Sequence, residues 1–175
     1  MKVAEAIRMK RAVRAFVGQP LPREAVLAIL DAGRRAQSSK NTQPWDFIAV
    51  EDPGVLQGLS RTGTYAGHLA GASLAIVIVT PNPEARWSIL FDAGQAAAYM
   101  QLAAWERGIG SCLATIYDPP AAQAILGVPS DRHIQVAISF GVPSDPKELT
   151  DPPRPGGRRP GAEVFHFNRW GTSLA

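Results

Sequence analysis

Cysteine is almost absent from this chain of 175 residues, which has only Cys112. A single thiol forms no internal disulfide, so the chain does not depend on the oxidising conditions that disulfide-rich secreted proteins need. No apolar run approaches the roughly 18 residues that cross a bilayer. The first six residues carry charges where a signal peptide has an apolar core. We therefore expect a cytoplasmic protein.

Several catalytic signatures are missing as well. The histidines, His68, His133 and His166, and Cys112 have none of the close pair spacings of a zinc site, so we expect no metal. There is no G-x-S-x-G turn for a hydrolase nucleophile and no phosphate-cradling glycine-rich loop. The glycines at 108–110 follow a helical pattern and precede a strand pattern, which is the reverse of the dinucleotide-binding order.

The charge is modest, with 18 basic and 15 acidic residues and a net charge of +3. The cations concentrate in two short runs, residues 8–14 and 154–159, rather than along one helix with interleaved aromatics. This distribution suits a small anion better than a nucleic acid, although the sign alone leaves an anionic polymer open.

Hydrophobic periodicity gives a coarse secondary structure for a single domain over residues 1–175. We expect helices over residues 3–9, 21–35, 87–107 and 120–126, a glycine-rich helical stretch over 63–71, and strands over residues 47–50, 74–79, 111–116 and 134–140. The strand at 74–79 is continuously apolar, which predicts burial on both faces.

The chain changes character after residue 143. Residues 144–161 are rich in proline and have almost no large apolar residue, so they predict an extended arm. A strand-like segment, residues 164–167, follows, and nothing local can pair with it. The arm is either a disordered tail or a device that reaches another subunit. We favour the second, because Val164, Phe165, Phe167 and Trp170 are costly to leave in water.

Three polar clusters remain, at residues 10–16, 36–45 and 156–160. Each has an ordinary explanation when taken alone. The first reads as a solvated basic turn, the second as a helix terminator before an edge strand, and the third as an unstructured basic tail. Their order along one chain is more informative than any one of them.

Taken in that order, the clusters resemble the nitroreductase-like FMN-dependent oxidoreductases over essentially the whole chain. Residues 7–16 resemble the opening basic signature of that family, and residues 36–47 resemble its Pro-Ser-x-x-Asn-x-Gln-Pro-Trp-x-Phe block, which is the more specific match. Residues 91–112 resemble its central helix and the following strand. Residues 164–170 resemble its C-terminal ending.

The resemblance implies an α+β fold with a mixed central sheet flanked by helices. Residues 144–175 would form an arm that adds a strand to the partner's sheet in a homodimer. Two FMN sites would lie at the subunit boundary. The implied activity is transfer of hydride from NADH or NADPH, through flavin N5, to a nitroaromatic, quinone or related small acceptor, and no catalytic side chain is required.

Three groups of residues would hold FMN if the resemblance is carried over by position. The phosphate or ribityl chain would meet Lys10, Arg11 and Arg14, and the arm would add Arg158 and the nearby Arg159. The opposite subunit would offer Ser38, Ser39 and Asn41 to the ring and ribityl hydroxyls. Flavin N5 and O4 would meet the backbone amides at Leu113, Thr115 and Ile116. Arg86 lies in neither basic cluster and should leave FMN affinity nearly untouched.

The sequence departs from the family pattern at three places. Ala12 stands where a phosphate-binding serine is common, Ala36 and Gln37 replace the usual Ala-Pro, and Ile116 stands where a glycine can occur. Two alternatives stay open. One is a specialised flavin enzyme for dehalogenation or flavin fragmentation, which the short stretch between Val50 and Leu74 disfavours because such relatives use an added lid. The other is a non-catalytic flavin-binding or nucleic-acid-associated protein.

Overall fold

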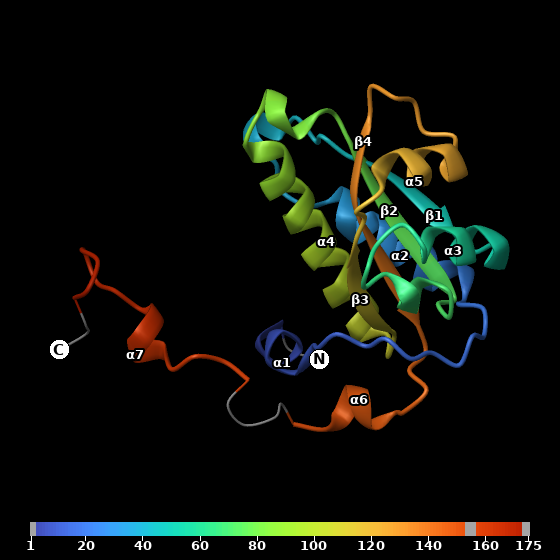
Figure 1. Ribbon diagram of the computed structural model, residues 1–175. Helices are drawn as coiled ribbons and strands as arrows, with labels where there is room; N and C mark the ends of the chain where they lie inside the picture. Colours follow the sequence, from blue (N-terminus) through green and yellow to red (C-terminus); the bar gives the residue numbers. More distant parts are fainter. Residues whose placement is uncertain (1–2, 153–156, 173–175) are drawn as a thin grey trace.

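The computed structural model describes residues 3–152 and 157–172. Met1 and Lys2, together with Arg154 and Gly156 of the second basic run, lie outside the described residues. The described part is an α+β structure in which one sheet carries helices on both faces (Figure 1).

The sheet has four strands in the order β1-β2-β4-β3. Its strands are β1 (Asp46–Val50), β2 (Leu74–Thr80), β3 (Gly110–Thr115) and β4 (His133–Gly141). All three strand pairings are antiparallel. The expected mixed sheet is therefore wrong for the described residues. Their one parallel pairing is an isolated bridge between Ala12 and Ser111.

Alternation along β2 divides the core in two. All seven residues of β2 are buried, as the continuous apolar run predicts. Leu74, Ile76 and Ile78 face one layer of helices, whereas Ala75 and Val77 face the other.

The first layer consists of α2 (Arg23–Arg34) and α4 (Ser88–Glu106). The two helices pack closely because Gly33 has no side chain. A Cβ at Gly33 would lie 2.1 Å from the Cε of Met100. This close approach buries Val26 and Ile29 against α4 and against Ile138 and Phe140 of the sheet.

The second layer is built from short helices, α3 (Pro53–Leu59), η2 (Gly67–Leu69) and α5 (Pro119–Leu126). The side chain of Asp52 caps α3 by accepting from the Val55 amide, and Asp118 caps α5 by accepting from the Ala121 amide. The Asp52-Pro53-Gly54 turn that ends β1 therefore also begins a helix that the sequence patterns did not reveal.

The remaining elements border the sheet. They are α1 (Val3–Met9), η1 (Ser39–Asn41), η3 (Pro83–Ala85), α6 (Lys147–Thr150) and α7 (Gly161–Val164). After α1 the chain runs past the start of β3, where the Val13 amide donates to the Ser111 carbonyl at 3.0 Å. Among the described helices none is long and apolar enough to cross a membrane.

The expected strand at residues 164–167 is not formed in the single chain. Gly161–Val164 form α7, and the residues that follow belong to no strand. In Figure 1 the segment with α7 stands apart from the sheet and its helices. A strand needs a partner for its backbone groups, and no strand lies beside this segment in the described residues.

Candidate functional site

The open edge of β3 is the first part of the candidate site. In an antiparallel pair the amides of one strand point alternately toward and away from its neighbour. The Ile116 amide donates to the Gln135 carbonyl at 2.9 Å, so it points toward β4. The amides of Leu113 and Thr115 consequently point away from β4, and within residues 3–152 and 157–172 no strand of the sheet lies on that side of β3. The expectation that Ile116 offers its amide to a flavin is thus corrected, whereas Leu113 and Thr115 suit that role.

Two cations of the first basic run border β3. The bridge between Ala12 and Ser111 holds residues 10–14 beside this strand. The Lys10 ammonium donates to the Gln101 side chain of α4, and burial lowers the pKa of Lys10. Arg11 has a different partner, because its guanidinium donates to the Asp151 carbonyl at the base of the arm.

Arg14 adds its charge close to Cys112 and His68. Burial raises the pKa of the Cys112 thiol, and the charges of Arg14 and Lys10 oppose that rise. Burial also lowers the pKa of His68, and the charge of Arg14 lowers it further. This corner of the fold therefore holds two cations beside a neutral thiol and a neutral imidazole.

Buried polar atoms without partners lie in the same corner. Among the described residues, the Ser111 hydroxyl and the His68 Nε2 are buried and make no hydrogen bond. Such atoms are uncommon in folded proteins. At the far end of β3, the segment at Gly63 packs closely enough that a Cβ there would lie 2.1 Å from the Thr115 carbonyl oxygen. The cations and the outward amides along this strand edge, with the unpartnered Ser111 hydroxyl beside them, form a donor set that fits an anionic ligand with a polar planar ring.

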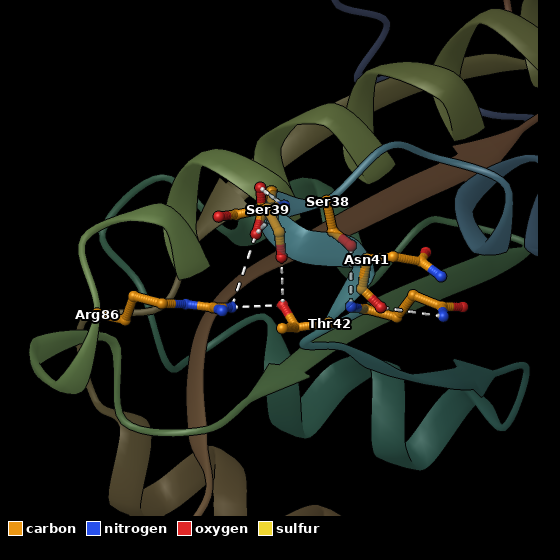
Figure 2. Close-up of polar contacts among 7 residues, drawn as sticks. Ser38, Ser39, Asn41, Thr42 and Arg86 are labelled. Carbon is orange, nitrogen blue, oxygen red and sulfur yellow. Dashed lines mark hydrogen bonds and ion pairs between the residues drawn. The ribbon is translucent and has the colours of Figure 1, made fainter.

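The second part of the candidate site is the loop with Ser38, Ser39 and Asn41. The Ser39 amide lies 3.1 and 3.2 Å from the two carboxylate oxygens of Asp92 on α4. The Ser38 hydroxyl accepts from the Gln43 amide at 2.9 Å. Figure 2 shows this loop beside α4, with Arg86 directed toward Thr42.

The two parts lie at different places along α4. Lys10 contacts Gln101 and Ser39 contacts Asp92, and these two positions of the helix are nine residues apart. At about 1.5 Å per residue the separation along the axis is about 14 Å. One chain therefore does not gather the loop and the cations around a single point.

The cations of the arm are also apart from the first cluster. Arg158 is exposed and donates to the Gly157 carbonyl, while Arg159 is exposed and contacts Glu163. Every hydrogen bond that the structure gives for residues 157–172 lies within that segment. The structure of one chain thus separates Arg158 and Arg159 from Arg14.

Sequence reasoning missed two residues of this region. Asp92 has a side chain that is only 2% exposed, and it lies 3.8 Å from Arg86. A signal existed, because Asp92 occupies the face of α4 that is otherwise marked by Ile89, Ala93 and Ala96. Arg86 was expected to leave FMN affinity nearly untouched because it lies in neither basic cluster, but its guanidinium donates to the Thr42 hydroxyl at 2.6 Å and so lies against the loop.

Comparison with known proteins gives consistent matches. The sequence model described as the Nitroreductase family matches residues 7–62 and 56–142. A protein of Archaeoglobus fulgidus named for NADH dehydrogenase and NAD(P)H nitroreductase is 31% identical over 152 residues, which are 82% of this chain and 86% of that protein. An iodotyrosine deiodinase of Thermotoga neapolitana is 25% identical, over 80% of this chain and 88% of its own. The solved structure of an FMN-dependent nitroreductase from Clostridium difficile R20291 superposes with a TM-score of 0.85 at 29% identity, over 96% of this chain and 100% of that one.

Proposed function

The chain belongs to the nitroreductase family, and on this premise we propose that it is an FMN-dependent NAD(P)H oxidoreductase that reduces a nitroaromatic, a quinone or a related small acceptor. The homologues' names support an oxidoreductase with a nicotinamide reductant, and the Clostridium difficile neighbour is FMN-dependent. The chemistry and the acceptor are our proposal, as is a cytoplasmic location.

The observation that carries the proposal is the edge of β3. There Lys10 and Arg14 lie beside the strand whose Leu113 and Thr115 amides point away from β4. A phosphate dianion is bound strongly by guanidinium and ammonium donors, and the electron-rich edge of a flavin ring is matched by backbone N–H groups. The half-exposed Leu113 side chain, 49% accessible, offers apolar surface next to these donors.

FMN, when bound, would supply the redox chemistry, which is net hydride transfer from NADH or NADPH to the acceptor. The chain's own residues bind and orient. Lys10 and Arg14 hold the phosphate, and the Leu113 and Thr115 amides present fixed dipoles that favour negative charge on the ring. No side chain of the described residues has to act as a nucleophile or general base, which agrees with the lack of a paired acid and base in the sequence.

A homodimer would bring the two parts of the site together. The outward side of α4 exposes Leu90, Phe91 and Tyr99, an apolar surface of the kind that marks an interface. If a second chain packs there about a two-fold axis, the Asp92 end of each α4 meets the Gln101 end of the other. The loop of one subunit then lies beside the cations of its partner, although the loop and the cations are about 14 Å apart along α4 within one chain.

The arm has a suitable place to bind on a partner. The sheet's other edge, β1, borders a groove of about 800 Å³ that is lined by the apolar residues Leu27, Leu30, Trp45 and Phe47 and by the polar residues Asp31, Arg34, Gln43 and Asp46. The arm exposes apolar side chains of its own, with Phe165 63% and Trp170 90% accessible. We infer that the arm of each subunit lies along β1 of the other, adding the strand that the single chain lacks.

The purified protein tests the proposal directly. We expect a yellow solution with an absorption band of oxidised flavin, FMN in the supernatant after heat denaturation, and bleaching by NADH or NADPH under anaerobic conditions. Turnover with a quinone or a nitroaromatic should then follow. A colourless protein that fails to take up added FMN would end the proposal.

A reductive dehalogenase is the second candidate, because an iodotyrosine deiodinase is among the relatives. The short connection between β1 and β2, which contains only α3 and η2, leaves little chain for a lid over a substrate. We therefore expect release of iodide from iodotyrosine to be much slower than quinone reduction. Equal or faster dehalogenation would reverse the order of the two candidates.

A further inference from the structure

Asp92 is an ionisable side chain in an apolar setting. It lies on the buried face of α4 among Ile89, Ala93 and Ala96, with its side chain 2% exposed. Its two oxygens lie 3.1 and 3.2 Å from the Ser39 amide. A buried carboxylate contributes little net stability compared with an apolar side chain. Its contacts with the loop are therefore the feature that needs explanation.

Arg86 links the same carboxylate to the loop from the other side. Its guanidinium lies 3.8 Å from Asp92 and donates to the Thr42 hydroxyl at 2.6 Å. That hydroxyl lies 3.0 Å from the Ser39 carbonyl oxygen. The contacts close a ring that passes from Asp92 through Ser39 and Thr42 to Arg86, and Figure 2 shows the part of it from Ser39 through Thr42 to Arg86. We call these four residues the loop clamp.

The loop needs such support because its backbone is strained. Lys40, Asn41 and Gln43 have φ angles of 52°, 55° and 46°. Residues other than glycine adopt this left-handed conformation at a cost, and they keep it where surrounding contacts fix it. The clamp holds the N-terminal side of the strained stretch, and the Ser38 hydroxyl accepts the Gln43 amide at its C-terminal side.

We propose that Asp92 and Arg86 are positioning residues that hold the Ser38–Asn41 loop in the conformation that binds the flavin ring and ribityl chain of the partner subunit's site. The inference rests on the proposed function, because it needs an FMN site that includes this loop. Asp92 and Arg86 themselves touch the loop and not the cofactor.

The test compares FMN binding with folding in matched variants of the full chain. Asp92→Asn keeps the volume but removes one acceptor for the Ser39 amide. Arg86→Gln removes the positive charge. Arg86→Lys keeps the charge but loses the planar guanidinium, whose N–H groups reach both Asp92 and Thr42. Glu106→Gln and Arg107→Gln are the controls, because each neutralises one side of an exposed ion pair that lies outside the loop and outside the groove at β1.

Three quantities are measured for each protein, the FMN dissociation constant by fluorescence titration, the visible circular dichroism of bound FMN, and the Tm of the apoprotein. We expect Asp92→Asn and Arg86→Gln to weaken FMN binding about tenfold or more and to alter the visible circular dichroism. Arg86→Lys should recover part of the affinity. The two controls should match the parent.

A further variant keeps the test decisive if the buried changes hinder folding. Thr42 is exposed, and Thr42→Val removes only the hydroxyl that joins Arg86 to Ser39. It should weaken FMN binding several-fold at an unchanged apoprotein Tm. Parent-like FMN binding in Thr42→Val and Arg86→Gln would overturn the inference while the proposed function stands. A parent protein that binds no FMN would overturn both.

Discussion

The Nδ1 atom of His68 lies 2.8 Å from the hydroxyl oxygen of Ser139. The Ser139 hydroxyl in turn lies 3.3 Å from the Cys112 carbonyl oxygen, to which it donates. The hydroxyl and Nδ1 thus share a hydrogen bond that ties the imidazole to the sheet. The pair joins η2 to β4 and β3 on the side of the sheet where Arg14 lies.

Acidification should destabilise the protein through His68. Burial and the charge of Arg14 lower the pKa of His68 in the folded state. The unfolded chain therefore binds a proton first as the pH falls below about 6.5, and the free energy of unfolding decreases. We expect the apoprotein Tm to fall between about pH 7.5 and 5.5, and His68→Gln to show a shallower fall.

His133→Gln is the control for that measurement. His133 also shares a side-chain hydrogen bond, with the Gln135 amide, but it lies at the start of β4 and Cys112 lies opposite Ser139 farther along that strand. Its replacement should leave the slope of Tm against pH as it is in the parent. Equal slopes in His68→Gln and the parent would show that His68 is not the titrating group.

Ala12→Ser should tighten FMN binding. Ala12 is exposed and its backbone pairs with Ser111, so an added hydroxyl has room beside Lys10 and Arg14. A hydrogen bond to a charged phosphate is worth about 1.5 to 3 kcal/mol at best, which makes a change of about tenfold the realistic expectation. Fluorescence titration checks it, with Ala15→Ser as the matched control in the same segment. Unchanged or weaker binding would place the phosphate elsewhere.

Removing the arm should break the dimer. A chain that ends at Asp151 loses Phe165 and Trp170, which are exposed in the single chain and need a partner to cover them. It also exposes the groove at β1 to water. We expect monomer, aggregate or insoluble protein by size-exclusion chromatography with light scattering. A soluble, FMN-loaded monomer would contradict the exchanged arm.

Much of the fold could be predicted from the sequence because its signals are local. The apolar run of β2 and the long period of α4 each appear within a few residues of their predicted bounds. The strand directions could not be predicted in the same way, because pairing depends on residues far apart, and the sheet proved antiparallel. The strand expected at residues 164–167 is not formed in the single chain, and its pairing with a partner subunit stays a prediction.

The candidate site likewise has residues that local sequence signals predicted and residues that depend on contacts far apart in the chain. Lys10, Arg14, Leu113 and Thr115 were predicted, and the structure places them along one strand edge. Ile116 failed because strand alternation, which a motif does not reveal, turns its amide toward Gln135. Asp92 and Arg86 were missed because their role arises from contacts with a loop 44 to 53 residues earlier in the chain.

The sharpest prediction joins Arg14 to Arg158 across the dimer. The two arginines are separated within one chain, because the Arg158 guanidinium donates to the Gly157 carbonyl of its own segment and the segment with α7 stands apart from the sheet (Figure 1). If they bind one phosphate, they come from different subunits. Each single alanine variant should then weaken FMN binding, by about tenfold or more for a shielded contact. The double variant should deviate from the sum of the two free-energy changes, because neighbours that share a partner are not additive.

A mixed dimer identifies which subunit provides each arginine. We propose to co-express an Arg14→Ala chain with an Arg158→Ala chain under different tags and to isolate the heterodimer. If each site takes Arg14 from one subunit and Arg158 from the other, one site has lost both arginines and the second has kept both. FMN titration should then show half of the sites at the parent affinity and half much weaker. If both arginines came from the same subunit, each site would lack one of them and no site would bind as in the parent. A heterodimer in which both sites bind as in the parent would mean that neither arginine contacts the phosphate, and the basic Pro-Gly run would be only a solvated tether.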